Sequence, residues 1–377
     1  MRVLVAAIGP LSGTGYATRL ATMVRAYADA GWTVDLLQAR NETQLPPGEG
    51  TMSLLRDYIP VALPDLRPRD HFSSLPPLAR LLTSHLPAGL GSRTYDVAQA
   101  ESSAVWPAVQ STAAAAKILV LHDDDSIRYR RIAKQVRDPR RKLVRAAAAI
   151  KYARFQRQAI READQVWFVS EPELQRLGDT TGKFVLVSNG AAAGFFEIPV
   201  GADPARRIAT FVGPATYDAN RRAVEFFVGR IWPLVREQVG DAELRLVGEG
   251  WEETARVATG VHDRGWVADL PAEVGQAAVV IAPLLDGGGT KIKVLEAMAA
   301  ARPVVATAIA AEGIPGSNGL CIADDPGAFA NCVARFLSDA DLAAEAGETN
   351  RRAVHGLEWS AIWRRAMAEI ERVVLTS

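Results

Sequence analysis

The sequence is poor in the residues that bind metal ions. Its 377 residues include two cysteines and five histidines. Cys321 and Cys332 both lie in apolar surroundings, and neither has the spacing of a metal ligand or a histidine pair beside it. The pattern argues against a zinc site and fits a reducing cytoplasm.

An excess of one charge and a long hydrophobic run are missing as well. The 43 lysines and arginines balance 43 aspartates and glutamates, so the net charge predicts no attraction to nucleic acid or to a membrane. The apolar run at the amino end stops at Gly9 and Pro10, which makes it too short for a secretion signal or a membrane span. We therefore expect a cytoplasmic protein.

Strand and helix patterns alternate along most of the chain. A length of 377 residues suits two domains, and the alternation indicates an α/β fold with parallel sheets. Residues 45–91 are rich in proline and lack a clean period, so we expect a mixed, partly irregular insertion there. A helix is expected over 359–374. Strands are expected at 3–8, 33–37, 95–99, 117–121, 165–169 and 183–187, and then at 208–212, 244–247, 279–283, 304–307 and 320–322.

The most informative stretch runs from residue 282 to residue 306. It has the pattern of a buried strand, a turn of Gly287, Gly288 and Gly289, a helix and a second buried strand. Glycines let the backbone turn sharply and approach a ligand, and Thr290 is placed to cap the helix. The first N–H groups of a helix have no partner within it, so this turn is predicted to bind an anion.

Charged side chains flank the same turn. Lys291 and Lys293 add two cations, and Glu296 is placed to accept hydrogen bonds from a sugar diol. A phosphate site next to a diol site indicates a nucleotide. The alternative is an ordinary helix start with solvated lysines.

This stretch resembles the donor-site signature of the GT-B-fold retaining glycosyltransferases of family four. A subgroup of that family carries Gly-Gly-Gly-Thr, a basic pair and Leu-Glu-Ala-Met-Ala, as this chain does from residue 287 onward. The second family glutamate maps onto Glu296. The first, which contacts the donor sugar, maps onto Gly288, and Asp286 is its nearest substitute.

The resemblance implies a fold and a reaction. The fold is two Rossmann-like domains with parallel sheets facing across a cleft. Residues 1–188 form the acceptor side, residues 189–357 bind the nucleotide-sugar, and the helix of 358–377 packs back on the first domain. The reaction is sugar transfer with retention of configuration, without a metal ion and without a cofactor other than the nucleotide-sugar itself, which is a co-substrate.

His122 is the second candidate for catalysis. It ends a predicted strand and precedes an acidic run, Asp123 to Asp125. The family histidine at this place lies near the transferred sugar, so the resemblance implies that role here. A histidine that only satisfies backbone groups is the alternative. Three consecutive carboxylates do not converge on one ion, so we expect the acidic run to cap the next helix instead of holding a metal.

The resemblance also implies donor-binding roles for a glycine loop near the amino end, for Trp266 and for Arg221. The loop with Gly13 and Gly15 opens a helix after the first strand, and Arg19 is placed one turn later; a plain strand-to-helix turn is equally compatible. Trp266 falls in the loop that touches the nucleobase in relatives, although simple packing fits it as well. The usual phosphate-binding Arg and Lys are replaced by Pro214 and, at about the lysine position, Ala219. Arg221, Lys291 and Lys293 are then expected to supply the charge.

Residues 128–161 are strongly basic. A solvated helix face is the usual meaning of such a run, and nucleic-acid binding is not expected because no aromatic platform accompanies it. Peripheral contact with the inner face of an anionic membrane is the other interpretation.

The sequence therefore predicts a glycosyltransferase that uses a nucleotide-sugar donor. The acceptor is open: a glycan, a lipid-linked molecule or a small molecule. Two alternatives remain on the same fold. One is a sugar-nucleotide epimerase or hydrolase, and the other is a degenerate relative that binds a nucleotide or a partner without catalysis.

Overall fold

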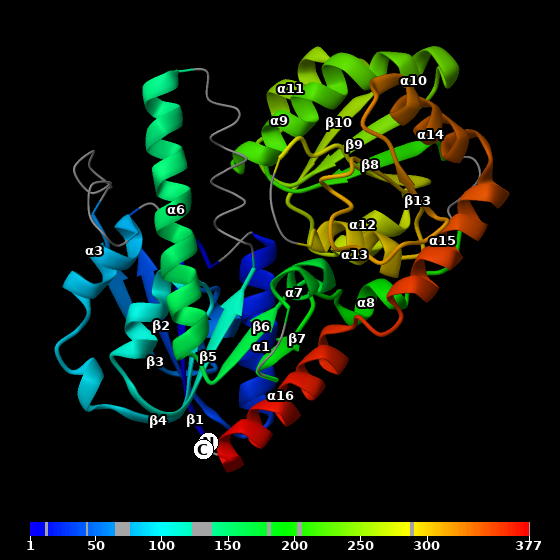
Figure 1. Ribbon diagram of the computed structural model, residues 1–377. Helices are drawn as coiled ribbons and strands as arrows, with labels where there is room; N and C mark the ends of the chain where they lie inside the picture. Colours follow the sequence, from blue (N-terminus) through cyan, green and yellow to red (C-terminus); the bar gives the residue numbers. More distant parts are fainter. Residues whose placement is uncertain are drawn as a thin grey trace. The chain divides into compact units, whose positions relative to one another are not determined.

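The chain folds into two compact units. The computed structural model describes residues 1–11, 14–42, 44–64, 76–122, 138–178, 182–201, 206–286 and 290–376. The first unit is Met1–Ser188 with Trp363–Ser377, and the second is Asn189–Ile362 (Figure 1). Each unit is a parallel sheet with helices packed against it, as the alternating sequence pattern predicts.

The first unit is built on a seven-stranded sheet. Every pair of neighbouring strands is parallel, in the order β3-β2-β1-β4-β5-β6-β7. The order reverses between β1 and β4, and such a point in a parallel sheet is where ligands bind. The strands are β1 (Arg2–Ile8), β2 (Thr33–Arg40), β3 (Leu55–Ala62), β4 (Thr94–Ala100), β5 (Ala113–Leu121), β6 (Gln165–Phe168) and β7 (Phe184–Leu186).

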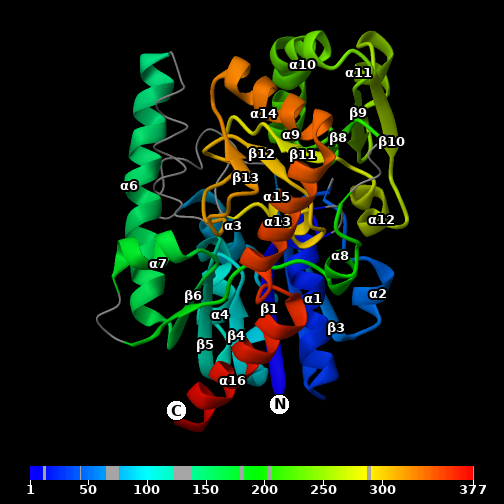
Figure 2. The same ribbon diagram turned by 90° about the vertical axis from the view of Figure 1, so that its right-hand side faces the viewer.

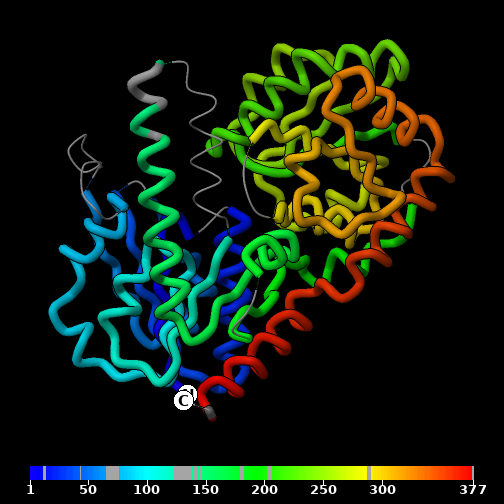
Figure 3. Tube along the Cα trace, in the orientation of Figure 1, coloured from blue at the N-terminus to red at the C-terminus, as the bar shows by residue number. Residues whose placement is uncertain are grey.

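The carboxyl-terminal helix packs on the first helix of the chain. The indole N–H of Trp363 donates a 3.0 Å hydrogen bond to the hydroxyl oxygen of Thr22, and the Arg19 guanidinium lies 4.9 Å from the Trp363 ring centroid. Figure 2 shows the end of this helix beside the first unit, and Figure 3 traces its path. The helices that contribute to this unit are α1 (Gly15–Asp29), α2 (Glu49–Met52), α3 (Pro77–His85), α4 (Trp106–Gln110), α6 (Pro139–Glu162), α7 (Glu171–Leu177) and α16 (Trp359–Thr376).

The second unit repeats the arrangement with six parallel strands. Its order is β10-β9-β8-β11-β12-β13, so the reversal falls between β8 and β11. The strands are β8 (Ile208–Val212), β9 (Glu243–Val247), β10 (Val261–Gly265), β11 (Val279–Ala282), β12 (Val304–Ala306) and β13 (Leu320–Ile322). The helices are α8 (Ala193–Phe196), α9 (Asp218–Phe226), α10 (Trp232–Gln238), α11 (Glu252–Val257), α12 (Leu270–Gly275), α13 (Ile292–Ala299), α14 (Pro326–Ser338) and α15 (Ala340–Val354).

Two edge strands differ from the sequence-based expectation. β3 lies in the segment predicted to be partly irregular, and β10 was not predicted. An edge strand buries little surface, so its hydrophobic pattern is weak. β3 carries Pro60, which an edge tolerates, and β10 consists largely of polar residues. The eleven strands that the sequence predicts are all present.

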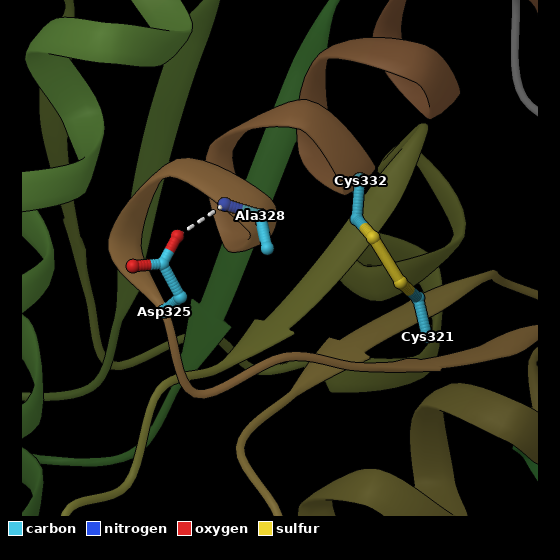
Figure 4. Close-up of a disulfide and its surroundings, with 4 residues drawn as sticks. All are labelled: Cys321, Asp325, Ala328 and Cys332. Atoms are coloured by element: carbon cyan, nitrogen blue, oxygen red, sulfur yellow. Dashed lines mark hydrogen bonds between the residues drawn. A yellow bond between two sulfur atoms is a disulfide. The ribbon is translucent and has the colours of Figure 1, made fainter.

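The two cysteines are joined. Cys321 on β13 forms a disulfide with Cys332 on α14, whose Cα atom lies 6.6 Å from that of Cys321 (Figure 4). At the start of α14, Asp325 accepts a 2.9 Å hydrogen bond from the amide of Ala328 and caps the helix. The pairing could not be predicted from the sequence, because an eleven-residue separation does not show that a strand and a helix lie together. The expectation of a reducing compartment finds no support in it.

Candidate functional site

The strongest candidate site lies in the second unit, where the strand order reverses. β8 leads into α9, and β11 leads through Asp286 into α13. Both helices therefore begin at the carboxyl edge of the sheet, beside the reversal between β8 and β11. The predicted glycine turn falls here, but Gly287, Gly288 and Gly289 lie outside the described residues.

Lys293 is held in place by two contacts. Its ammonium group donates a 2.7 Å hydrogen bond to the side-chain oxygen of Asn220 on α9, and it lies 4.2 Å from the centroid of the Phe211 ring. Asn220 is oriented in turn, because its amide nitrogen donates to the Pro214 carbonyl oxygen across 3.0 Å. Burial lowers the pKa of Lys293 to about 7. Part of its surface stays accessible, so a ligand can reach it.

Gly213 allows this close packing. Its φ angle is 138°, a conformation that L side chains rarely adopt, and a Cβ atom there would lie 2.9 Å from the Lys293 ammonium nitrogen and 2.5 Å from the Asn220 amide nitrogen. The backbone of the β8–α9 loop thus runs against the lysine without a side chain between them.

Glu296 lies one turn along α13 from Lys293. Burial raises its pKa to about 8, and the charge of Lys293 opposes that rise. Between about pH 7 and pH 8, the charged member of the pair therefore changes from the lysine to the acid. Below pH 7 the lysine is charged and the acid is neutral; above pH 8 the acid is charged and the lysine is neutral.

Two predicted residues have other partners. The Asp286 carboxylate is ion-paired with Arg222 on α9, which also contacts Asp218. Arg221 is half exposed, and its guanidinium is paired with Asp218 and Glu225 of its own helix. The residue of α9 that contacts Lys293 is instead Asn220, which the sequence analysis did not single out.

The remaining predicted donor-site residues are placed as follows. Thr290 is buried, and its carbonyl oxygen accepts a 3.1 Å hydrogen bond from the side chain of Asn189. The capping prediction is wrong: α13 begins one residue later, and its cap position is Lys291, which makes no side-chain capping hydrogen bond. Trp266 follows β10 and is 74% exposed, so its indole is accessible to a base. A base contact at Trp266 stays a prediction.

A second cluster lies at the reversal of the first sheet. Glu101 follows β4, is fully buried, and forms a 3.0 Å hydrogen bond with Nε2 of His122, which follows β5. The His122 ring meets the Tyr16 ring edge to face, with centroids 5.2 Å apart. Burial raises the pKa of Glu101, but the hydrogen bond and charge of His122 and the charge of Arg19 outweigh this, and the pKa falls below its usual range.

Glu101 is the main residue that the sequence analysis missed. A carboxylate two residues after the predicted strand of 95–99 was the available signal, because that position in a parallel sheet is a ligand edge. The first helix turn matches expectation in part. Gly15 opens α1 and Thr14 caps it, while Gly13 lies outside the described residues. Arg19 is fully buried and donates to the Ser188 carbonyl oxygen across 3.0 Å, so it is part of the packing.

The basic run is described from residue 138 onward, and the acidic run Asp123–Asp125 lies outside the described residues. α6 has one packed end: Ala149, Tyr152 and Ala159 are buried. Toward its amino end, Leu143 is 72% exposed and Val144 46% exposed. Figure 1 shows this end extending beyond the sheet of the first unit.

The described residues contain neither a membrane-spanning helix nor a group of metal ligands. Within the ranges that the structure covers, no helix is long and apolar enough to cross a bilayer. In the same ranges, no three histidine, cysteine, aspartate or glutamate side chains are grouped so that they could hold a metal ion.

Comparison with known protein families matches both units. A model described as glycosyl transferase 4-like domain matches residues 14–190, and one described as glycosyl transferases group 1 matches residues 206–339. An uncharacterized 44.6 kDa protein in the cps region of Klebsiella pneumoniae is 27% identical over 139 residues. That match covers 33% of this chain and 36% of the relative, so the chain spans about a third of the relative's length.

Solved structures match over the whole chain. Sucrose-phosphate synthase from Thermosynechococcus elongatus superposes with a TM-score of 0.70 at 19% identity, over 100% of both chains. HepE of Anabaena, solved with UDP and glucose, gives 0.63 at 13% identity over 97% of this chain and 99% of that one. TarM of S. aureus, in complex with fondaparinux, alpha-GlcNAc-glycerol and UDP, gives 0.66 at 11% identity over 98% of this chain and 100% of that one. At these identities the likeness shows the fold.

Proposed function

Because the chain is a GT-B-fold glycosyltransferase of family four, with a glycosyl transferase 4-like domain and a glycosyl transferases group 1 domain, we propose that it takes a sugar from a nucleoside diphosphate donor bound at Lys293 and Glu296. One observation carries this proposal: Lys293, Asn220 and Glu296 lie together at the strand-order reversal of the second sheet. The structure of HepE with UDP and glucose supports the choice of donor class.

In this proposal the residues of the site act by stabilising negative charge. In the transfer the bond between the sugar anomeric carbon and the diphosphate oxygen breaks, and a bond to an acceptor oxygen forms. We propose that Lys291 and Lys293, with the start of α13, stabilise the charge on the departing diphosphate. Glu296 holds the ribose diol. The acceptor oxygen bonds to the face of the sugar that the diphosphate leaves, so the configuration is retained, and the acceptor proton passes to the departing phosphate oxygen without a metal ion.

His122 has a separate role in this proposal. We assign it to the transferred sugar, where its ring forms a hydrogen bond and does not act as a nucleophile. Asp286 is proposed to contact the donor sugar, which it can do after exchanging Arg222 for a sugar hydroxyl. Gly13, Gly15, Gly287, Gly288 and Gly289 are proposed to line the donor with backbone groups alone, whereas Arg221, Trp266 and Thr290 contribute side chains.

A binding protein without catalysis is the second candidate. The observation that favours it is Gly288, where relatives have a glutamate, together with the ion pair that occupies Asp286. The two candidates differ in one experiment. Incubation with a panel of nucleotide-sugars and a mixture of glycan, lipid-linked and small-molecule acceptors should release nucleoside diphosphate and form a glycoside in which the sugar keeps its configuration. Binding of donor without release identifies the non-catalytic relative, and equal release without acceptor identifies a hydrolase.

We also propose that the amino end of α6 contacts an anionic membrane surface. The helix carries eight arginines or lysines and one glutamate, although the whole chain is neutral. Leu143, Val144 and Ile150 are exposed on the same helix, at 72%, 46% and 53%. Basic residues near an acidic bilayer contribute about 1 kcal/mol each, and exposed apolar side chains add to that by entering the interface. A lipid-linked acceptor fits such a location.

A further inference from the structure

A buried carboxylate lies directly behind His122. The side chain of Glu101 is fully enclosed, and its amide donates a 2.8 Å hydrogen bond to the Ala6 carbonyl oxygen, which fixes it between β1 and β4. Burying an ionised carboxylate costs several kcal/mol unless partners compensate for the lost water. Packing alone would be served better by an apolar side chain of the same size, so the charge at this position calls for another explanation.

Both carboxylate oxygens of Glu101 have a hydrogen-bond partner. One oxygen is hydrogen-bonded to Nε2 of His122 at 3.0 Å, and the other accepts from the side-chain amide of Gln99. The charges of His122 and Arg19 lie nearby and favour the ionised form. An ionised carboxylate only accepts hydrogen bonds, so the nitrogen that faces it must carry a proton.

Gln99 is itself oriented by the core. Its side-chain oxygen accepts from the hydroxyl of Tyr27, and its nitrogen also contacts the sulfur of Met23 at 2.9 Å. The Tyr27 ring is stacked on Trp32 with centroids 5.2 Å apart. Burial raises the pKa of Tyr27 well above its usual value, so the hydroxyl remains a donor. The amide of Gln99 therefore points its N–H group at Glu101, and a flipped amide would lose both contacts.

We propose that Glu101 is a positioning residue that holds the His122 ring with a proton on Nε2, so that Nδ1 is the nitrogen left for the reacting sugar. The ring is fixed from a second side by Tyr16. A carboxylate that orients a histidine in this way selects one tautomer and one ring orientation. The kinetic part of this inference rests on the proposed glycosyl transfer; the tautomer part does not.

The tautomer is measured on the free protein. Histidine side-chain nitrogen-15 NMR spectra separate the two neutral forms, and the His122 signals are those that vanish in His122→Ala. The wild type should show the proton on Nε2. Glu101→Leu, which matches the volume, removes the acceptor. In Glu101→Gln the amide oxygen takes the N–H of Gln99, so the amide N–H faces His122. Both variants should therefore populate the other tautomer. A wild-type proton on Nδ1, or identical spectra in all three proteins, would overturn the proposal.

A matched control separates this effect from a general loss of stability. Asp35 is also a fully buried carboxylate in the first sheet, paired with Arg56 on β3. Asp35→Asn should lower the melting temperature without changing the His122 tautomer. If Asp35→Asn changes the tautomer as much as Glu101→Gln does, the effect is not specific to Glu101.

Turnover gives an independent test with the same variants. Misplacing a group that contacts the transition state costs up to about a hundredfold, so Glu101→Gln should lower kcat by roughly ten- to a hundredfold and leave the KM for the donor unchanged. In a His122→Ala background the same substitution should have no further effect on kcat, because Glu101 acts through that ring. An equal loss in both backgrounds would mean a structural role. If no donor is turned over at all, the proposed function fails while the NMR result still decides the tautomer.

Discussion

The ammonium group of Lys293 donates a 2.7 Å hydrogen bond to the side-chain oxygen of Asn220, joining the first turn of α13 to the first turn of α9. These turns follow β11 and β8, the strands between which the order of the second sheet reverses. The diphosphate site that we propose lies at this contact. In the proposed site, Asn220 positions a lysine, whereas the usual phosphate-binding arginine is replaced by Pro214.

The first prediction concerns pH. The Lys293–Glu296 pair changes from a net charge of +1 below pH 7 to −1 above pH 8, because the pKa of the lysine is about 7 and that of the acid about 8. Affinity for inorganic diphosphate should therefore fall as pH rises from 6.5 to 8.5. Each proton that must be taken up on binding weakens affinity by about tenfold per pH unit. Calorimetric titration across this range measures the slope.

The ligand itself titrates in the same range, so the slope needs a control. Lys293→Met keeps the length of the side chain and removes its charge, so the remaining slope is that of the ligand and of Glu296. A wild-type slope equal to that of Lys293→Met would show that the lysine does not titrate on binding.

The second prediction concerns Glu296. Above pH 8, where the Glu296 carboxylate is ionised, Glu296→Gln should fold normally and weaken binding of a nucleoside diphosphate by about 1–3 kcal/mol, because an amide replaces the charged acceptor of the diol hydrogen bonds. Affinity for inorganic diphosphate, which has no ribose, should change less. An unfolded variant by circular dichroism would show that Glu296 is structural.

The third prediction concerns Gly213. Gly213→Ala places a Cβ atom 2.9 Å from the Lys293 nitrogen and forces a side chain into a φ of 138°, so we expect a stability loss of about 1–3 kcal/mol and weaker diphosphate binding. Gly229→Ala is the matched control, since a Cβ atom there meets nothing within 4 Å. Chemical denaturation of both variants measures their free energies of unfolding. Equal values would mean that the backbone of the β8–α9 loop relaxes freely to accept the Cβ atom.

The fourth prediction concerns α6. The protein should sediment with vesicles of phosphatidylglycerol and phosphatidylcholine but not with phosphatidylcholine alone, and binding should weaken with salt. Leu143→Asp should reduce binding. Val257→Asp, a substitution at an equally exposed residue of the second unit, should not. Equal binding to both vesicle types, or no difference between the two variants, would contradict the proposal.

The sequence predicted the sheets better than the site. Buried parallel strands such as β11 are continuous apolar runs and are visible in one dimension, whereas the edge strands β3 and β10 are not. Lys293 and Glu296 were singled out because a glycine turn, a helix and two charges are neighbours in the chain. Asn220 and Glu101 were missed because their importance comes from partners 73 and 21 residues away, which only the folded chain brings within reach.

The central claim is that the second unit binds a nucleoside diphosphate at Lys293, and calorimetry with wild type, Lys293→Met and Arg256→Met tests it most directly. Arg256 is an exposed cation on α11 of the same unit, with 75% of its side chain accessible. The account predicts that a panel of nucleoside diphosphates contains at least one ligand whose affinity falls by about 1.5–3 kcal/mol, roughly ten- to more than a hundredfold, in Lys293→Met and is unchanged in Arg256→Met. Equal affinity of wild type and Lys293→Met for every diphosphate that binds would contradict it.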